Sequence, residues 1–273
     1  MEFKRELSNK VQDAVSQSDV YRLLDARYGP MLVNPNDKFI GRSFELYGEF
    51  SEGEVALFRR IVKPGSVILD LGANIGAHTV ALAKLLDRTG WVIAFEPARL
   101  TFQLLCANVA LNNLFNVRCH HAAVAETRGT IRVPVLEPTT RQNFGGLDLR
   151  NTTKGEPTPQ TAIDDLDLQR CDFIKVDVEG MEIQALKGAA KTIGRLHPVL
   201  YVENDRVENS DALISLIGSY DYRLYWHRPP LFNPDNFYKN AENVFGAIVS
   251  DNMLCIPRPS KITVKGLAEI AVP

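Results

Sequence analysis

The chain has 273 residues, of which 45% are hydrophobic and 23% are charged, and its formal net charge is -2. This length suits one α/β domain with an N-terminal addition. A weakly acidic chain has no general attraction for nucleic acids or anionic lipids, so no nucleic-acid partner is expected. No apolar run approaches the roughly eighteen residues of a transmembrane helix, so no membrane span is predicted.

The four cysteines are scattered in apolar contexts, which favours buried, reduced thiols over disulfides or a zinc site. The first residues, MEFKRELSNKVQD, are charged and lack an apolar core, unlike a signal peptide. Together these features predict a cytoplasmic protein.

We divide the chain into an N-terminal extension (1–60), a core domain (61–257) and a loosely specified tail (258–273). In the extension, apolar residues recur at helical spacing from Leu7 to Leu24, and Tyr28-Gly29-Pro30 ends that helix. The following segment, 31–47, is rich in turn residues, and a second helix is predicted over 52–61.

The core domain alternates strands with helices, as an α/β protein does. Strands are predicted over 66–71, 91–96, 117–124, 172–178 and 198–203. Helices are predicted over 75–87, 98–112, 181–194 and 209–218. Between the third and fourth strands, short strands over 129–136 and 144–150 predict a β excursion above the cleft. Residues 222–226 and 245–256 predict a closing antiparallel pair. The expected fold is a Rossmann-like, doubly wound, mostly parallel sheet.

A strand, a glycine turn, a helix and a second strand follow one another between Val67 and Pro97. This order is typical of the βαβ unit that holds an adenosine-bearing cofactor at the carboxyl edge of a parallel sheet. An acid at the end of the second strand commonly accepts hydrogen bonds from the ribose hydroxyls. The predicted cofactor-binding residues are Asp70, Gly72, Asn74, Gly76, Glu96 and Pro97.

The middle position of the glycine turn distinguishes between two cofactors. A dinucleotide site usually has glycine there, because the backbone must approach a pyrophosphate closely. Asn74 places a side chain in that gap, whereas S-adenosylmethionine has no phosphate. We therefore favour S-adenosylmethionine. An NAD(P)-dependent oxidoreductase and a non-catalytic protein that binds S-adenosylmethionine are the alternative functions.

The strand over 172–178 puts its apolar side chains on one face and Lys175, Asp177 and Glu179 on the other. Buried charges are costly unless they pair or face a cleft. Asp177 and Glu179 lie at the carboxyl end of the strand, where ligands bind in such sheets. Substrate orientation, a general base and a carboxylate pair for a divalent cation are the functional interpretations. The alternative is an internal Lys175–Asp177 ion pair, with Glu179 starting the next helix.

Further candidates follow later strands. Glu203 ends the strand after Asp177, and neighbouring parallel strands lie about 5 Å apart, so either it faces the same cleft or it lies in a solvated loop. The proline-stiffened loop after Trp226 suits closure over a polar substrate, which makes Trp226 and Asn236 substrate candidates. His227 is either a base for a hydroxyl or a packed, hydrogen-bonded histidine.

The strings GANIGAHT after VILDL, then AFEP, TAIDDL and DFIKVDVEGMEIQALKGA, resemble FkbM-type methyltransferases over roughly Glu54 to Glu203. The resemblance implies a class I methyltransferase fold, S-adenosylmethionine as cofactor and, for many members, transfer to a hydroxyl group. It implies the cofactor loop Asp70, Gly72, Asn74 and Gly76, with Glu96 on the ribose. It gives the second block, Asp177 to Gly180, no defined chemical role. Asn143, near glycines in the β excursion, becomes a substrate candidate.

The expected function is therefore O-methylation of a hydroxyl on a small molecule, sugar or glycolipid. An alcohol needs a base as its bond to the methyl carbon forms, or a cation that acidifies it. Asp177 is the first candidate, followed by His227 and Glu179, and a divalent cation is a weaker option. The amphipathic extension is expected to act as a lid or as a homodimer surface. A nucleic-acid methyltransferase is the least favoured alternative.

Overall fold

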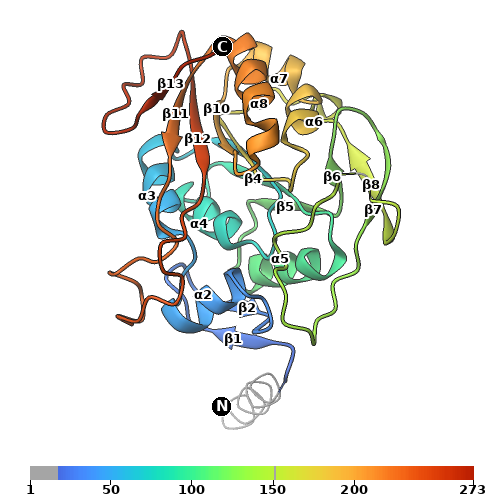
Figure 1. The fold of residues 1–273 in the computed structure, drawn as a ribbon, viewed down its shortest axis with the longest axis vertical. Helices are drawn as coiled ribbons and strands as arrows, with labels where there is room; N and C mark the ends of the chain where they lie inside the picture. Colours follow the sequence, from blue (N-terminus) through green and yellow to red (C-terminus); the bar gives the residue numbers. More distant parts are fainter. Residues whose placement is uncertain (1–17, 151) are drawn as a thin grey trace.

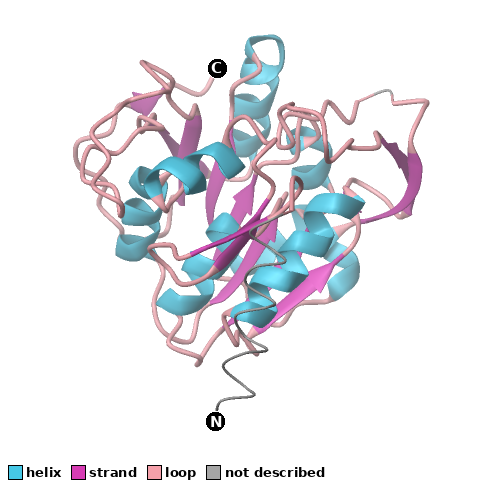
Figure 2. Ribbon diagram, turned by 90° about the horizontal axis from the view of Figure 1, so that it is seen from below, coloured by secondary structure: helices cyan, strands magenta, loops and turns pink. Residues whose placement is uncertain are grey.

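The computed structural model describes residues 18–150 and 152–273. At its centre lies an eight-stranded sheet in the order β13–β11–β12–β10–β9–β3–β4–β5, and helices cover both of its faces (Figures 1 and 2). Five neighbouring strands run parallel: β10 (Val199–Glu203), β9 (Phe173–Val176), β3 (Val67–Leu71), β4 (Trp91–Phe95) and β5 (Val117–His120). The expected α/β, doubly wound, mostly parallel fold is confirmed.

The chain leaves the centre of the sheet in two directions. After β3 it adds β4 and β5 on one side and then β9 and β10 on the other, so the strand order reverses between β3 and β9. The intervening helices are α4 (Ala77–Leu85), α5 (Arg99–Leu111), α6 (Glu182–Lys187), α7 (Ala190–Leu196) and α8 (Val207–Ser219). A crevice forms at such a reversal, beyond the carboxyl ends of the strands.

The predicted helix over 181–194 is wrong in one respect, because it is two helices. α6 ends at Lys187 and α7 starts at Ala190. At Gly188, between them, a side chain would come within 2.0 Å of the Ala125 carbonyl oxygen. Close approach of the β excursion therefore requires glycine at this bend.

The described part of the extension contains a hairpin and two helices: β1 (Arg22–Leu24), β2 (Met31–Val33), α2 (Ile40–Tyr47) and α3 (Glu52–Ile61). α3 has the predicted bounds. Up to residue 17, the helix predicted from Leu7 to Leu24 lies outside the described residues. Its last part is wrong, because β1 pairs with β2 across a Gly-Pro turn. α2 is unpredicted, since turn residues surround its buried Ile40, Phe44 and Tyr47.

Each face of the sheet has its own apolar core, because successive strand residues point to opposite faces. In β9, Ile174 and Val176 belong to the core that includes residues of α6, α7 and α8. Phe173 packs on the other face, where its ring lies 5.3 Å from that of Phe58 in α3. The predicted alternation along this strand is confirmed, and it directs Lys175 to the same face as Phe173.

The β excursion is a three-stranded sheet of β6 (Ala123–Val124), β8 (Glu156–Thr161) and β7 (Gly129–Val133). A short 3-10 helix, Ile163–Leu166, follows it. β7 confirms the strand predicted from 129, but the strand predicted over 144–150 is wrong. Gly145 and Gly146 lie in that segment, which forms a loop. The sequence did not indicate β8, because this strand contains Pro157 and Pro159. The two prolines alternate with residues whose N–H groups remain available for pairing with β7.

The predicted closing pair is confirmed as β11 (Tyr222–His227) and β12 (Asn252–Pro257), which run antiparallel. The second strand starts at 252 rather than 245, because 228–251 forms a long loop. β12 also pairs antiparallel with β10, and β13 (Glu269–Ile270) pairs with β11 at the edge of the sheet. The long loop therefore returns beside the carboxyl end of β10.

Candidate functional site

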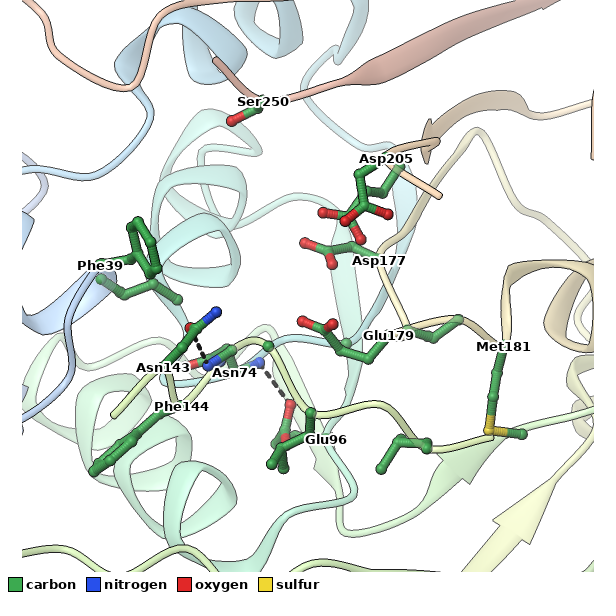
Figure 3. A pocket seen from close by; sticks show the side chains of 18 of the residues that line it. Phe39, Asn74, Glu96, Asn143, Phe144, Asp177, Glu179, Met181, Asp205 and Ser250 are labelled. Atoms are coloured by element: carbon green, nitrogen blue, oxygen red, sulfur yellow. Dashed lines mark hydrogen bonds between the residues drawn. The ribbon is translucent and has the colours of Figure 1, made fainter. Parts of the chain in front are cut away.

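A cleft of about 320 Å³ lies beyond the carboxyl ends of β3, β4, β9 and β10, within the roughly 300–1,000 Å³ of small-molecule sites. It occupies the crevice where the strand order reverses. Eight residues proposed from the sequence line it: Gly72, Asn74, Glu96, Pro97, Asn143, Asp177, Glu179 and Glu203. Figure 3 shows Asp177 and Glu179 on one side, with Phe39 and Asn143 on the opposite side.

Gly72, just after β3, is required because the chain passes very close to the segment that follows β9. Its φ is +81°, and a side chain there would come within 1.6 Å of the Asp177 carbonyl oxygen. Its N–H and that of Ala73 both donate to the Phe95 carbonyl, at 3.0 and 2.9 Å. The first glycine of the turn thus lets β3, β4 and β9 meet at one point.

Gly72→Ala is expected to lower the free energy of unfolding by about 2–5 kcal/mol, because a left-handed backbone strain is added to an overpacked contact. Chemical denaturation measures it. Gly194→Ala is the matched control, since Gly194 lies in α7 with nothing within 4 Å of the added carbon. A Gly72→Ala protein as stable as the wild type would contradict the close contact.

Asn74 also has a left-handed backbone, with φ of +50°. Asparagine tolerates this conformation better than most residues. Its side-chain Oδ1 accepts a hydrogen bond from the Ile75 N–H at 2.8 Å, and its own N–H donates to Glu96 Oε2 at 2.8 Å. The polar residue in the turn therefore connects the loop to the acid at the end of the next strand.

Glu96 is held rigidly at the floor of the cleft. Besides the bond from Asn74, its Oε1 accepts from the Ala98 N–H at 2.9 Å and the Thr101 hydroxyl at 2.8 Å. Burial raises the pKa of Glu96 to about 7, although these hydrogen bonds act to lower it. Hydroxyl donors from the cleft would favour its ionised form.

Asp70 and Gly76, which were predicted to bind cofactor, do not line the cleft. Asp70 is fully buried beneath it, and the Thr79 hydroxyl donates to its Oδ2 at 2.5 Å. Gly76 is the residue before α4, with φ of +87°. Both lie under the loop and shape it from below.

Lys175 lies at the centre of a buried row of polar groups. The strand register places it between Asp70 of β3 and Tyr201 of β10. Its ammonium lies 2.9 Å from Asp177 and 3.8 Å from Asp70. Burial alone would lower the pKa of Lys175, but these two carboxylates raise it above the ordinary value. The predicted internal ion pair with Asp177 is present.

Asp177 faces the cleft, and one third (33%) of its side chain is exposed. Burial acts to raise its pKa, but the Lys175 ammonium, as charge and as hydrogen-bond donor, brings the pKa below its ordinary range. The ion pair and the functional interpretation are therefore compatible. Lys175 holds an ionised carboxylate that can still accept a proton from the cleft.

Two further acids adjoin Asp177. Glu179 has φ of +56° and pairs with Arg206 at 3.1 Å, so it does not start the next helix as one prediction had it. Burial and the Asp177 charge raise the pKa of Glu179. Glu203 faces the same cleft as Asp177, and burial, together with that charge, raises its pKa well above the ordinary value. Crowding of carboxyl groups thus disfavours further negative charge here.

His227 does not line the cleft. Its Nδ1 lies 2.8 Å from the hydroxyl oxygen of the buried Tyr201, and burial lowers its pKa. Its surroundings match the packed, hydrogen-bonded alternative. The geometry gives it no direct route to a group in the cleft.

Trp226 and Asn236 likewise lie outside the cleft. The Arg228 guanidinium sits 4.0 Å from the centre of the Trp226 ring. Asn236 is fully buried and donates to the carbonyls of Asn233 and Asn240, which fixes the turn of its own loop. Trp226 packs against the core of the sheet, and Asn236 shapes the loop over 228–251.

An apolar wall completes the cleft, and local sequence motifs did not indicate it. The residues come from α2, the segments around it and the loop over 228–251: Phe39, Ile40, Phe50, Leu231, Ile248 and Val249. Hydrogen bonds to the loop between β7 and β8 hold the segment that precedes α2. The Phe144 N–H lies 3.4 Å from the Asp37 carboxylate, and the Lys38 N–H donates to the Gln142 carbonyl at 2.9 Å.

No group of three or more His, Cys, Asp or Glu side chains within 18–150 and 152–273 is arranged to hold a metal ion. In the same part of the chain, no helix is long and apolar enough to cross a membrane.

A family model described as the methyltransferase FkbM domain matches residues 70–224. Methyltransferase sdnD of Sordaria araneosa is 27% identical over an alignment of 154 residues, with a coverage of 44% of this chain and 59% of that protein. Methyltransferase 1 of Beauveria bassiana (strain ARSEF 2860) is 26% identical over an alignment of 145 residues, with a coverage of 45% of this chain and 58% of that protein. The chain thus spans less than two thirds of the length of these curated relatives.

Among solved structures, the crystal structure of methyltransferase FkbM from Methylobacillus flagellatus KT is 21% identical, with a TM-score of 0.46. The match covers 74% of this chain and 50% of that one.

Proposed function

We propose, because the chain belongs to the FkbM methyltransferase family, that it transfers the methyl group of S-adenosylmethionine to a hydroxyl of a small molecule, a sugar or a glycolipid. One observation supports this most directly. The glycine loop after β3, Glu96 after β4 and Asp177 after β9 all face one cleft. A site for a nucleoside cofactor and a base for an alcohol therefore adjoin each other.

The residues of the cleft fit the proposed cofactor. Glu96 Oε2 has one lone pair left for a ribose hydroxyl after the carboxylate accepts its three protein hydrogen bonds. Pro97 and Ala122 to Val124 give an apolar wall next to it, suited to a purine ring. Gly72 and Asn74 offer the backbone and amide groups that the methionine part needs.

When bound, S-adenosylmethionine supplies a methyl group on a sulfonium, whose leaving sulfide is neutral and needs no acid. The tasks of the chain are then alignment, which contributes about 7–11 kcal/mol in well-oriented systems, and acceptance of the hydroxyl proton. Asp177 is suited to the second task, because Lys175 keeps it ionised and part of its side chain is open to the cleft.

Glu96→Ala is expected to weaken binding of S-adenosylhomocysteine by at least about tenfold, because a charge-assisted hydrogen bond to the ribose is lost. Isothermal titration calorimetry measures the affinity. Glu126→Ala removes an exposed glutamate that does not line the cleft and serves as the control. Equal affinity in both variants would refute the ribose assignment.

Methyl transfer is tested with methyl-labelled cofactor and fractionated cell extract. The label is expected in an acceptor that keeps it through alkali, as a methyl ether does. A label that alkali releases, or that is found on nitrogen, would contradict transfer to a hydroxyl. Binding of NADH in place of S-adenosylhomocysteine would favour the oxidoreductase alternative.

A further inference from the structure

The acceptor half of the cleft has two unlike walls. The apolar wall contains Phe39 and Phe50 from the extension and Leu231, Ile248 and Val249 from the loop over 228–251. The wall opposite Phe39 is formed by the ends of β9 and β10, where Asp177, Glu179 and Asp205 lie together (Figure 3).

The ionisable side chains that line the cleft are all acidic. Among the described residues that line it, six carry a carboxyl group and none is a lysine, arginine or histidine: Glu96, Asp177, Glu179, Glu203, Asp205 and Asp251. Three nearby cations contact these acids, but none of the three lines the cleft. Lys175 lies 2.9 Å from Asp177, Arg206 lies 3.1 Å from Glu179, and Arg228 lies 2.6 Å from Asp251.

Not all six acids are ionised, because burial and neighbouring charge raise the pKa of Glu179 and of Glu203, whereas Lys175 keeps Asp177 ionised by lowering its pKa. Among the described residues, Glu203 Oε2 has no hydrogen-bond partner and is shielded from solvent. The Asp205 side chain, 49% exposed, lies 3.8 Å from Arg206 Nε. An anionic ligand would meet the ionised Asp177 and the acids beside it without any basic side chain of the cleft to pair with, and like charges brought together in an interface are strongly unfavourable. Hydroxyl groups, by contrast, donate to carboxylates.

We propose that the acceptor is an uncharged hydroxyl compound with one apolar face, and that the acids on the β9 and β10 side exclude acceptors that carry a phosphate or a carboxylate. This inference rests on the proposed methyl transfer and narrows its substrate class. The apolar face lies against Phe39, Phe50 and Leu231, and the hydroxyl face lies against Asp177 and Glu203.

The test uses two probes that differ in one group. Phenyl β-glucoside and phenyl β-glucuronide share an aromatic ring and a sugar, but the second carries a carboxylate. Affinities are measured by ligand-observed NMR on the full chain loaded with S-adenosylhomocysteine, at low salt. The glucoside is expected to bind at least about tenfold more tightly, and salt is expected to narrow the difference because it screens charge.

Variants locate the source of the discrimination. Asp205→Asn is expected to reduce the preference for the glucoside, and Asp205→Lys to reverse it, because a cation then faces the cleft. Asp87→Asn, which removes an exposed carboxylate just after α4, outside the cleft lining, is expected to leave the preference unchanged.

Three results would overturn the inference: equal binding of the two probes, tighter binding of the glucuronide, or no binding of either at millimolar concentration. Loading with S-adenosylhomocysteine is measured first by calorimetry. Failure to load would refute the proposed cofactor, whereas loading followed by one of these results would refute only the acceptor class.

Discussion

Asp177→Asn is expected to reduce methyl transfer by about 10²–10⁴-fold while S-adenosylhomocysteine still binds within several-fold of the wild-type affinity. Asparagine keeps the size of the side chain but cannot take a proton from an alcohol, and loss of a positioned general base typically costs this much. Single-turnover transfer from methyl-labelled cofactor to the labelled acceptor fraction measures the rate, and calorimetry measures the affinity.

Two controls separate chemistry from folding. Asp87→Asn makes the same chemical change at an exposed site outside the cleft lining and is expected to keep full activity. Thermal unfolding of Asp177→Asn shows how much stability is lost with the Lys175 pair. A folded Asp177→Asn protein with wild-type turnover would remove Asp177 from the mechanism.

Lys175→Met is expected to lower the free energy of unfolding by about 3–5 kcal/mol, because removing one member of a buried charge group leaves its partners uncompensated. Lys175 has only 4% of its side chain exposed, and Asp70, 3.8 Å from it, is fully buried. Denaturant titration measures the change. Lys187→Met, at an exposed lysine of α6, is the control and is expected to stay close to wild type.

Lys175→Met is also expected to change the pH dependence of kcat/KM. The Lys175 ammonium lowers the pKa of Asp177, so its removal raises that pKa. A general base acts only when ionised, and the acid limb of kcat/KM should therefore move to higher pH in the fraction of Lys175→Met that folds. An acid limb that does not move, together with unchanged stability, would show that Lys175 does not support Asp177.

The sequence predicted the parts of the fold that are encoded locally. Apolar runs that lead into Asp70, Glu96 and Asp177 mark three parallel strands, because each strand is buried on both faces. The predictions failed where a distant contact decides the conformation. Gly188 divides a helix because the β excursion passes over it, and the strand at Arg22 forms because a partner follows the Gly-Pro turn.

The residues of the candidate site differ in the same way: some are placed by local sequence and others by distant contacts. Gly72, Asn74 and Glu96 belong to one βαβ unit, so their spacing is enough to place them together. Phe39 and Leu231 come from opposite ends of the chain and meet only in an apolar cluster with Tyr47 of α2 and Phe245 of the loop over 228–251. His227 ends β11 and sits beside an aromatic residue in the sequence, and only the tertiary structure places it against Tyr201 rather than in the cleft.

A crystal structure of the chain with S-adenosylhomocysteine tests most directly that one cleft holds both cofactor and base. The predicted result has a ribose hydroxyl within hydrogen-bond distance of Glu96 Oε2, and the sulfur directed toward the half of the cleft that contains Asp177. A ligand bound elsewhere, or with its ribose away from Glu96 and its sulfur away from Asp177, would contradict the account.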